Sequence, residues 1–399
     1  MHRIELDPQP AATIVVFQPF YPPAILGGGP IRTVSALVDA ASAPERIYVL
    51  TSDRDLGQRE RLNVQRNHWT NQPSRAHVYY VSDDSISKYL RALRDVRRKR
   101  PGIVYFNSVF SVKYAIIPLF ARLIGVWRGA TLIIAPRGEL SPRALSVRAR
   151  KKSLYLSAFR LAQFHERVTW HASSEREASD IRRVFGTNAT IVVREDETAL
   201  PEDPTIPIER HHESLRLIFV GRIAPIKGLD VLLTALREVA LDVRLDIFGG
   251  TEDLEYGAKC HAIAAGVPPN ITIRFQGPIP HSEVVASFAS SDAFAFPTES
   301  ENFAHVIAES LSASCPVLVA DVTPWSATIE EGGGVLVRDT SPRGWAQVID
   351  DLASEGVSGW FNRRIKAAGA YVQWRSEDRG PNIFDLVAAK TCDSDRSAP

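Results

Sequence analysis

The chain has little cysteine, no long hydrophobic run and no excess of charge of either sign. Its three cysteines lie far apart and show no metal-ligand spacing, which indicates a reducing compartment without a disulfide framework. We interpret Cys260, Cys315 and Cys392 as structural thiols. Residues 1–12 lack the apolar stretch of a signal peptide, and the best apolar run, 114–121, is broken by a proline. The sequence therefore predicts a cytoplasmic protein.

The balance of charge and the missing motifs exclude further classes. Lys and Arg number 47 and Asp and Glu number 46, so the overall charge gives no reason to expect a nucleic-acid partner, whose phosphates favour a basic excess. There is no His-x-x-x-His motif and no cysteine cluster, so we expect no metal site. What remains is an ordinary globular composition, 45% hydrophobic and 23% charged.

Short apolar runs alternate with helical patterns along almost the whole chain, which is typical of parallel sheets covered by helices. With 399 residues the chain exceeds one core, and the polar, proline-bearing stretch 195–214 separates two halves. We predict an α/β fold of two facing Rossmann-like domains with a cleft between them. The domains span residues 1–200 and 201–380, and a tail or helix, 381–399, packs back on the first. Strands are expected at 13–17, 47–50, 78–81, 103–106, 131–135, 168–172, 215–220, 245–248, 271–275, 293–296 and 317–320.

Two loops that follow expected strands could hold phosphate. Gly27, Gly28 and Gly29 precede a helical run, where bare backbone amides and the helix dipole favour an anion; a flexible turn without a ligand explains the glycines equally well. The loop 221–230 carries Arg222 and Lys227 between glycines, and two cations there can neutralise a diphosphate and stabilise it as a leaving group. The alternative is a pair of solvated surface charges.

The stretch after the strand 293–296 contains two glutamates. Glu301 lies in the loop, and Glu309 follows two helical turns later. If the helix begins near Phe303, its free amides offer an anion site and Glu301 can accept hydrogen bonds from sugar hydroxyls. Glu309 can then reach a ribose. The alternative is that the glutamates complement the helix dipole and Glu309 lies on a solvated face.

Together these residues make the second half resemble glycosyltransferase family 4, a retaining group with the GT-B fold and two glutamates separated by seven residues. The resemblance covers about residues 215–340, and the first half more loosely through its glycine loop. It implies that Arg222 and Lys227 bind the diphosphate, that Glu301 meets the donor sugar and that Glu309 meets the ribose. Further donor contacts implied by the family's glycine turn, nucleobase loop and glutamate motif are Gly28, Gly29, Gly249, Gly250, Gly277, Pro278, Asn302, Phe303 and Ala304.

The resemblance implies a function. The enzyme is expected to move a hexose from a nucleotide-diphosphate sugar to a saccharide or lipid-linked saccharide, in bacterial-type polysaccharide or glycoconjugate synthesis. It is expected to retain the anomeric configuration, with the leaving diphosphate as base, and to need neither a cofactor nor a metal. The first domain would bind the acceptor and the second the donor. Alternatives are an epimerase or phosphorylase on the same fold, or a non-catalytic nucleotide-sugar-binding protein.

The chain departs from the family at several points. Asn302-Phe303-Ala304 stands where many members have glycine-phenylalanine-glycine, and Arg194-Glu195-Asp196 replaces an asparagine-glycine turn. Pro136-Arg137-Gly138-Glu139 replaces a histidine, so we assign Arg137 a catalytic role and place Glu139 beside it; a structural ion pair is the alternative. His171 and His305 either line the cleft or are structural, hydrogen-bonded histidines.

The first half also contains a basic stretch, 143–160, with no acidic residue between Glu139 and Glu166. Interleaved apolar residues predict a basic amphipathic helix that lies on anionic lipid, and six more basic residues lie within 91–100. The sequence thus predicts a peripheral protein at the inner face of the plasma membrane; two solvated helices are the alternative. The basic residues of the stretch are Arg143, Arg148, Arg150, Lys151, Lys152 and Arg160.

Overall fold

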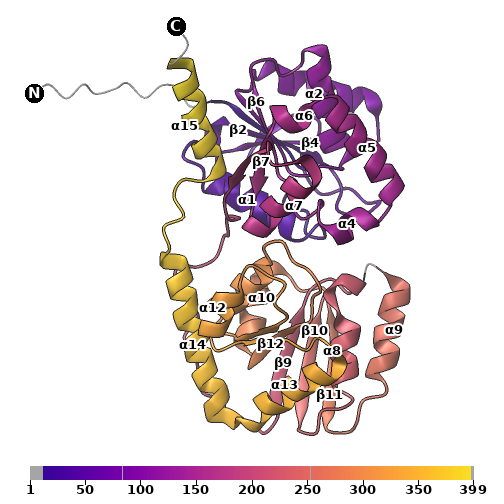
Figure 1. The fold of residues 1–399 in the computed structure, drawn as a ribbon, viewed down its shortest axis with the longest axis vertical. Coiled ribbons are helices and arrows are strands. Elements are labelled where there is room, and N and C mark those ends of the chain that lie inside the picture. Colours follow the sequence, from indigo (N-terminus) through magenta and orange to yellow (C-terminus); the bar gives the residue numbers. More distant parts are fainter. Residues whose placement is uncertain (1–11, 83, 252, 397–399) are drawn as a thin grey trace, which may run out of the picture. The chain divides into compact units, whose positions relative to one another are not determined.

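The computed structural model describes residues 12–82, 84–251 and 253–396. The chain divides into two compact units (Figure 1). Unit 1 comprises Met1–Ala199 and Arg379–Pro399, and unit 2 comprises Leu200–Asp378. Of the predicted thiols, Cys260 and Cys315 are buried and free, whereas the side chain of Cys392 lies outside the described residues.

Unit 1 is built on an eight-stranded sheet in the order β3-β4-β2-β1-β5-β6-β7-β8. The strands pair in parallel except β3, which is antiparallel to β4 at the edge. Their central residues are buried on both faces, which is why they read as continuous apolar runs. The strands are β1 (Ile14–Phe17), β2 (Ile47–Ser52), β3 (Trp69–Asn71), β4 (His77–Val81), β5 (Ile103–Phe106), β6 (Thr131–Ile134), β7 (Thr169–Ala172) and β8 (Thr190–Val193).

Helices cover both faces of this sheet, and each face has its own hydrophobic core. The C-terminal helix α15 belongs to unit 1: its Ile383 and Phe384 are fully buried, and the Phe384 ring meets Tyr105 edge-on at 5.2 Å. The helices are α1 (Gly29–Asp39), α2 (Ile86–Arg98), α3 (Ile117–Phe120), α4 (Pro142–Ser146), α5 (Ala149–Leu161), α6 (Phe164–Arg167), α7 (Glu175–Phe185) and α15 (Ile383–Arg396), with single turns η1 (Pro44–Arg46), η2 (Val112–Ile116) and η3 (Ala121–Ile124).

Unit 2 has a six-stranded, fully parallel sheet in the order β11-β10-β9-β12-β13-β14. The strands are β9 (Leu215–Val220), β10 (Val243–Phe248), β11 (Ile271–Gly277), β12 (Ala293–Phe296), β13 (Val317–Val319) and β14 (Val335–Leu336). The helices are α8 (Leu229–Ala235), α9 (Leu254–Ala264), α10 (His281–Ala289), α11 (His305–Ser312), α12 (Ser326–Glu331), α13 (Pro342–Ser354) and α14 (Gly356–Ser376), and one short turn is η4 (Pro225–Lys227).

The predicted α/β class with two parallel sheets is confirmed, and each expected strand is present within a few residues. In both sheets the strand order reverses beside the first strand of the unit, between β1 and β5 and between β9 and β12. Open α/β sheets bind ligands beyond the carboxyl ends of their strands at such a switch point. No helix in the described part of the chain has the length and apolar character needed to cross a membrane.

Candidate functional site

The loops after β9 and β12 meet at the switch point of unit 2. The backbone amide of Glu299 donates to the carbonyl of Ile226 at 3.0 Å, and Thr298 Oγ1 lies 3.2 Å from the same carbonyl oxygen. The two loops therefore hold each other in place through the backbone. Residues 74 positions apart in the sequence, Lys227 and Glu301, are brought together by this pairing.

Lys227 and Glu301 form an ion pair in which Lys227 Nζ donates to Glu301 Oε1. Thr298 Oγ1 donates to the same carboxylate oxygen at 2.8 Å, and the Lys227 ammonium lies 5.2 Å from the centre of the Phe296 ring. Both side chains are largely buried, 15% and 12% exposed. The pair is largely buried and lies at a switch point. A charged ligand that binds there can take the place of one member of the pair. Arg222, in the same loop, is exposed.

Two glycines of the unit 2 loops, Gly228 and the predicted Gly249, serve close packing of the backbone. A Cβ on Gly228, whose φ is +65°, would lie 2.1 Å from the carbonyl oxygen of Pro297, and a Cβ on Gly249 would lie 1.8 Å from that of Gly221. Only glycine permits such approaches. Gly249 also donates to the Gly277 carbonyl at 2.9 Å, so the ends of β10 and β11 are tied together.

Two other glycines leave space. The nearest atom to a Cβ on Gly250 is 4.0 Å away, on Pro278, and a Cβ on Gly277 would meet nothing within 4 Å. The backbone at these positions is therefore accessible to a ligand such as a base or a ribose. This difference within one glycine turn could not be read from the letters Gly249-Gly250.

The glutamate motif begins α11 two residues later than expected, at His305. Ala304 precedes it with φ +64°, so an alanine adopts the left-handed conformation that is easiest for glycine. The Phe303 ring is buried against Trp325, whose Nε1 donates to the Phe303 carbonyl at 2.5 Å. Packing and this hydrogen bond thus hold the backbone in a conformation that alanine rarely adopts.

Glu309 is buried, not solvated. Its side chain is 3% exposed, and its Oε1 lies 3.7 Å from His281 Nδ1 on α10. The alternative of a solvated face on α11 is therefore wrong. Carboxylates are almost never this buried without a specific role or partner, and the placement beside an imidazole fits both a structural pair and a site for a hydroxylated ligand.

In unit 1, Arg137 lies in a buried polar network. Its guanidinium pairs with Asp196, donates to Asn107 Oδ1 at 2.7 Å and donates to the Tyr105 hydroxyl at 2.6 Å. Burial opposes the charge, but the neighbouring Asp196 raises the pKa of Arg137 above its ordinary value. Because the side chain is 5% exposed and engaged in several internal bonds, the structure supports the structural ion pair, and we do not propose Arg137 as catalytic.

His171 belongs to the same network. Its ring lies 2.9 Å from both the Tyr105 hydroxyl and the Arg194 carbonyl, and burial and the nearby Arg137 lower its pKa well below the ordinary value. It is the structural, hydrogen-bonded histidine of the two alternatives. His305 begins α11 and packs edge-on against Phe303 at 4.8 Å.

Glu139 lines a pocket of about 510 Å³ at the switch point of unit 1. Its carboxylate accepts hydrogen bonds from the Val109 amide at 2.6 Å and from Ser108 Oγ at 2.9 Å, and burial raises its pKa. The pocket combines this acid with hydroxyls, one cation and aromatic rings, a suitable surface for a polyhydroxylated ring. The other lining residues are Pro19, Phe20, Ser52, Ser108, Phe110, Ser111, Val112, Lys113 and Tyr114.

The glycine loop of unit 1 is fixed by a residue that sequence reasoning missed. Asp55, after β2, accepts hydrogen bonds from the Ile25 amide at 2.7 Å and the Leu26 amide at 3.1 Å. Gly28 follows with φ +66°, and Gly29 starts α1. Neither glycine lines the pocket described above. An aspartate in the loop after a buried strand was the available signal for Asp55.

Comparison with known families concerns mainly the second half of the chain. Residues 205–369 match the model of the family "Glycosyl transferases group 1". The match lies within unit 2 and includes Lys227, Glu301 and Glu309, so the predicted recognition is confirmed at the level of the group.

The names of curated relatives agree with this family match. A D-inositol 3-phosphate glycosyltransferase of Xylanimonas cellulosilytica is 27% identical over 245 residues, 55% of this chain and 56% of that protein. One of Mycobacterium sp. (strain KMS) is 32% identical over 158 residues, 38% of this chain and 35% of that protein. The matches thus span about half, or less, of these curated relatives.

The likeness to solved structures extends over both units and concerns the fold. Anabaena HepE in complex with UDP and glucose aligns with a TM-score of 0.69 at 16% identity, covering 97% of this chain and all of that chain. Sucrose-phosphate synthase of Thermosynechococcus elongatus aligns with a TM-score of 0.69 at 14% identity, covering 96% and 98%. The predicted GT-B fold class is confirmed.

Proposed function

We propose that the chain is a retaining glycosyltransferase that uses a nucleoside-diphosphate sugar. The observation that carries the proposal is the Lys227–Glu301 ion pair at the switch point of the group 1 domain. A cation that binds a diphosphate and a carboxylate that binds a sugar must lie within one donor molecule's length of each other. Support also comes from HepE, whose structures are described as complexes with UDP and with UDP-glucose.

In this proposal the donor replaces part of the ion pair. Lys227 turns from Glu301 to the diphosphate, with Arg222 as a second cation, and Glu301 turns to the sugar hydroxyls. Glu309 accepts hydrogen bonds from the ribose. The open backbone at Gly250, Gly277 and Pro278 borders the base, and the start of α11 at Asn302, Phe303 and Ala304 borders the phosphates.

The transfer itself needs no protein nucleophile. The bond between the anomeric carbon and the β-phosphate oxygen breaks, the acceptor hydroxyl oxygen bonds to the anomeric carbon on the same face, and its proton passes to the departing phosphate oxygen. Lys227 and Arg222 stabilise the charge that grows on the diphosphate. Because two cations and helix amides offset that charge, we propose that the reaction requires neither a metal nor a cofactor.

The acceptor side of the proposal rests on the pocket in unit 1. Glu139 and Ser108 can bond to hydroxyls, and Phe20 and Phe110 can stack on a sugar ring. A saccharide or lipid-linked saccharide is therefore our proposed acceptor, in bacterial-type polysaccharide or glycoconjugate synthesis on the cytoplasmic side. Because curated relatives are named D-inositol 3-phosphate glycosyltransferases, and Lys113 lines the pocket, a polyol phosphate is the second acceptor to test.

The test is a panel of nucleoside-diphosphate sugars, first by thermal shift and then by nucleoside-diphosphate release with and without acceptors. A donor present at 100 times its Kd stabilises the protein by about 2.7 kcal/mol. We expect slow donor hydrolysis, acceleration by an acceptor, an unchanged anomeric configuration in the product and full activity in EDTA. Donor binding without hydrolysis or transfer would instead indicate a binding protein. An epimerised donor would indicate an epimerase, and an absorbance band of pyridoxal phosphate would indicate a phosphorylase.

A further inference from the structure

The near-neutral total charge hides a strong separation of charge along the chain. Residues 86–165 contain 17 Lys and Arg but two acidic residues, Asp95 and Glu139, which is a net charge of +15 in a protein whose total is +1. The remaining residues therefore carry −14. Glu139 is buried in the pocket, so it contributes little to the surface of this region.

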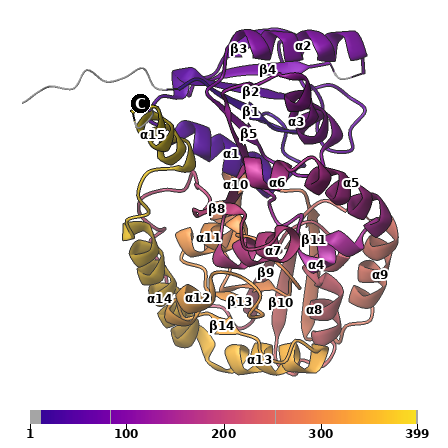
Figure 2. The same cartoon turned by 45° about the horizontal axis from the view of Figure 1, so that its top comes forward.

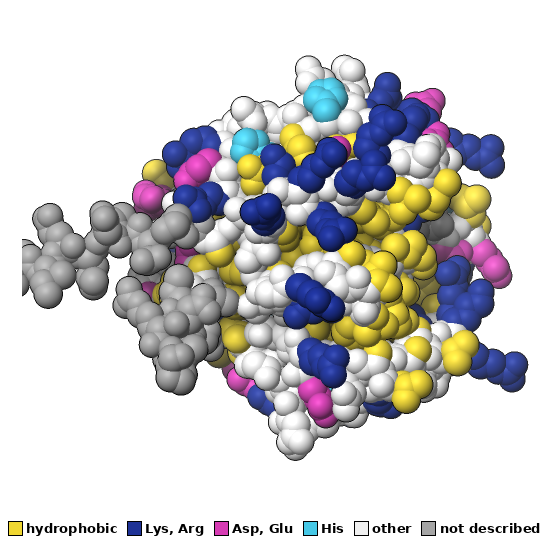
Figure 3. Space-filling view, turned by 90° about the horizontal axis from the view of Figure 1, so that it is seen from above, with side chains coloured by type: hydrophobic (Ala, Val, Ile, Leu, Met, Phe, Trp, Pro, Cys, Tyr) yellow, Lys and Arg dark blue, Asp and Glu magenta, His cyan; other side chains and the backbone are white. Residues whose placement is uncertain are grey.

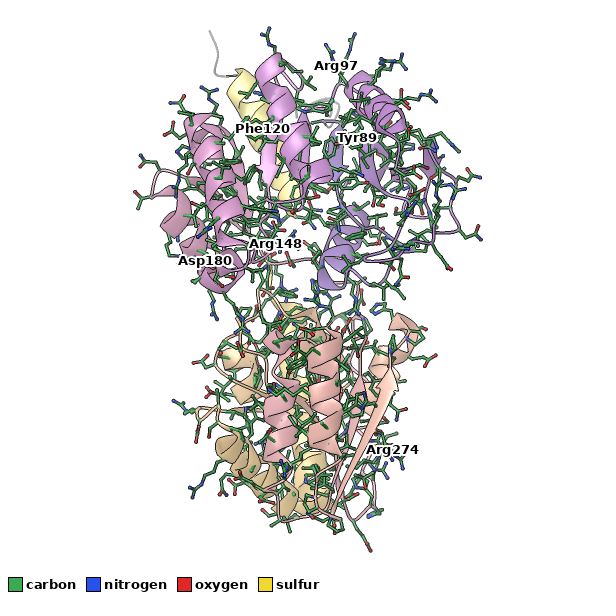
Figure 4. All side chains as sticks on the ribbon, turned by 90° about the vertical axis from the view of Figure 1, so that its right-hand side faces the viewer. Tyr89, Arg97, Phe120, Arg148, Asp180 and Arg274 are labelled. Atoms are coloured by element: carbon green, nitrogen blue, oxygen red, sulfur yellow. The ribbon has the colours of Figure 1, made fainter. Side chains whose placement is uncertain are left out.

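The structure places these residues on neighbouring elements of unit 1. The Tyr89 hydroxyl on α2 donates to the Lys113 carbonyl in η2, which ties α2 to the segment η2-α3-η3. The Tyr155 ring on α5 packs against Phe110 at 5.6 Å and Phe120 at 6.4 Å, which ties that segment to α5. Figure 2 shows α2, α3 and α5 along one side of the unit, and Figure 4 shows Tyr89, Arg97 and Phe120 from that side.

Large aliphatic side chains protrude from the same elements. The most exposed are Leu161 at 88%, Ile124 at 84%, Leu154 at 75% and Ile86 at 70%. In the space-filling view of this end of unit 1, hydrophobic side chains and many Lys and Arg lie together with few acidic ones (Figure 3). Exposed apolar patches among basic residues mark interaction sites, because water is a poor solvent for the former.

On α5 the exposed surface has a regular pattern. Leu154 and Leu161 are seven residues apart and so lie two turns apart on one face. Val147, just before the helix, is also exposed, as are Arg150 and Lys151 in its first turn. Only part of the predicted basic stretch is thus exposed and able to contact a partner.

Other basic residues of that stretch donate hydrogen bonds to backbone carbonyls of unit 1. Lys152 Nζ donates to the Ala144 carbonyl at 2.5 Å and lies 4.8 Å from the Phe110 ring centre, and burial lowers its pKa. Arg160 donates to the Val184 carbonyl. Leu156 and Phe159 are part of the core. The apolar side chains of α5 that can meet a partner are therefore the exposed Leu154 and Leu161.

We propose that this face, formed by α2, η3 and α5 of unit 1, binds the surface of an anionic phospholipid bilayer. Its guanidinium and ammonium groups meet the lipid phosphates, while Ile124, Leu154 and Leu161 enter the boundary between headgroups and acyl chains. A bilayer fits better than a nucleic acid, which offers phosphates but no apolar phase for protruding aliphatic side chains. Val112 and Lys113, which line the pocket of unit 1, belong to η2 beside this face, so a lipid-linked acceptor would reach the pocket from the bilayer; this last step rests on the proposed function.

The test is sedimentation with vesicles of phosphatidylcholine alone or mixed with phosphatidylglycerol, using the full chain without donor or acceptor. We expect binding to the mixed vesicles at about 0.1 M salt and loss of most of it at about 1 M, where screening acts over roughly 3 Å. The charge variant combines Arg148→Gln, Arg150→Gln and Lys151→Gln, and should bind at least tenfold more weakly, since each cation near the surface contributes about fivefold. The control removes the same charge from unit 2 through Arg237→Gln, Arg274→Gln and Arg343→Gln, all exposed, and should bind as the wild type does.

A second variant, Ile124→Gln with Leu161→Gln, tests the apolar contribution. Both side chains are exposed, so folding should be unaffected, and vesicle binding should fall severalfold. Equal loss in the unit 2 control, binding to phosphatidylcholine alone, or wild-type binding by both unit 1 variants would overturn the proposal. The proposal would also be overturned if a duplex oligonucleotide bound in a salt-sensitive way as tightly as the vesicles do, and if the Ile124 and Leu161 changes had no effect on vesicle binding. None of these results depends on glycosyl transfer, so a failure here is distinct from a failure of the proposed activity.

Discussion

Lys227 on the loop after β9 and Glu301 on the loop after β12 form an ion pair that spans the switch point of unit 2. Thr298 donates a second hydrogen bond to the same carboxylate oxygen. In the proposed function, a diphosphate ligand would compete directly with Glu301 for the Lys227 ammonium, so ligand binding and the position of Glu301 would be coupled.

This coupling gives the first prediction. Glu301→Gln should lower kcat roughly 100-fold or more, because a contact made as charge develops at the anomeric carbon is lost. Nucleoside-diphosphate affinity should stay equal or increase, since Lys227 no longer has a competing carboxylate. Steady-state kinetics and a diphosphate titration check both. Glu299→Gln, an exposed position in the same loop, is the control, and full activity of Glu301→Gln would remove the central assignment.

If Glu309 holds the ribose, as proposed, its replacement should behave differently, because a ribose would be bound alike in the ground and transition states. Glu309→Gln should raise the donor KM about tenfold or more with little change in kcat, the mark of uniform binding. Calorimetric titration with a nucleoside diphosphate should show the same loss, whereas inorganic diphosphate, which has no ribose, should bind as it does to the wild type. Equal weakening for both ligands would instead assign Glu309 to the framework of α10 and α11.

Much of the fold could be predicted because buried parallel strands leave continuous apolar runs in the sequence. The strands that were missed, β3, β8 and β14, lie at sheet edges, and their residues are half-exposed or exposed, so they carry no such run. Proline and polar residues marked the region between the units well enough that the expected boundary at 200 and the observed one at Ala199 nearly coincide.

The candidate site was only partly predictable. Loops after strands were the right place to search, but the partner of Lys227 depends on which strands lie side by side, and sequence order does not give this. Arg137 illustrates the limit: its partners Asn107 and Asp196 follow β5 and β8, and without the strand order a buried ion pair and a catalytic arginine look the same. Burial of Glu309 was likewise hidden, because helical periodicity indicates a face but not what covers it.

The glycine turn after β10 allows a matched comparison. Gly249→Ala would place a Cβ 1.8 Å from the Gly221 carbonyl oxygen, and overpacking of this kind costs about 1–3 kcal/mol. Gly250→Ala has its nearest neighbour at 4.0 Å and should change stability by less than about 0.5 kcal/mol. Chemical denaturation of both variants measures this. If Gly250 borders the nucleotide, Gly250→Ala should still weaken nucleoside-diphosphate binding; equal stability of the two variants would contradict the packing role of Gly249.

The last prediction concerns pH and the buried network of unit 1. The Arg194 carbonyl can only accept, so His171 Nε2 carries the hydrogen, and Nδ1 then accepts from the Tyr105 hydroxyl, which in turn accepts from Arg137. A protonated ring would lose the acceptor at Nδ1 and add a second cation near Arg137. Burial and Arg137 accordingly lower the pKa of His171 well below 6.5 in the folded protein.

Because the unfolded chain binds this proton below pH 6.5 and the folded chain does not, stability contributed by neutral His171 should be lost as pH falls from 6.5. One such group changes the free energy of unfolding by at most about 1.4 kcal/mol per pH unit. Burial raises the pKa of Glu177, and that shift acts in the opposite direction, so the difference between wild type and His171→Gln is the quantity to measure. We expect His171→Gln to be less stable than the wild type at pH 7, and we expect this gap in unfolding free energy to narrow towards pH 5. Calorimetry of the unit 1 transition measures the gap at each pH. His68→Gln, which removes an exposed ring of the same unit, is the control for loss of an imidazole. A gap that stays constant with pH for His171→Gln would mean that His171 is protonated alike in both states.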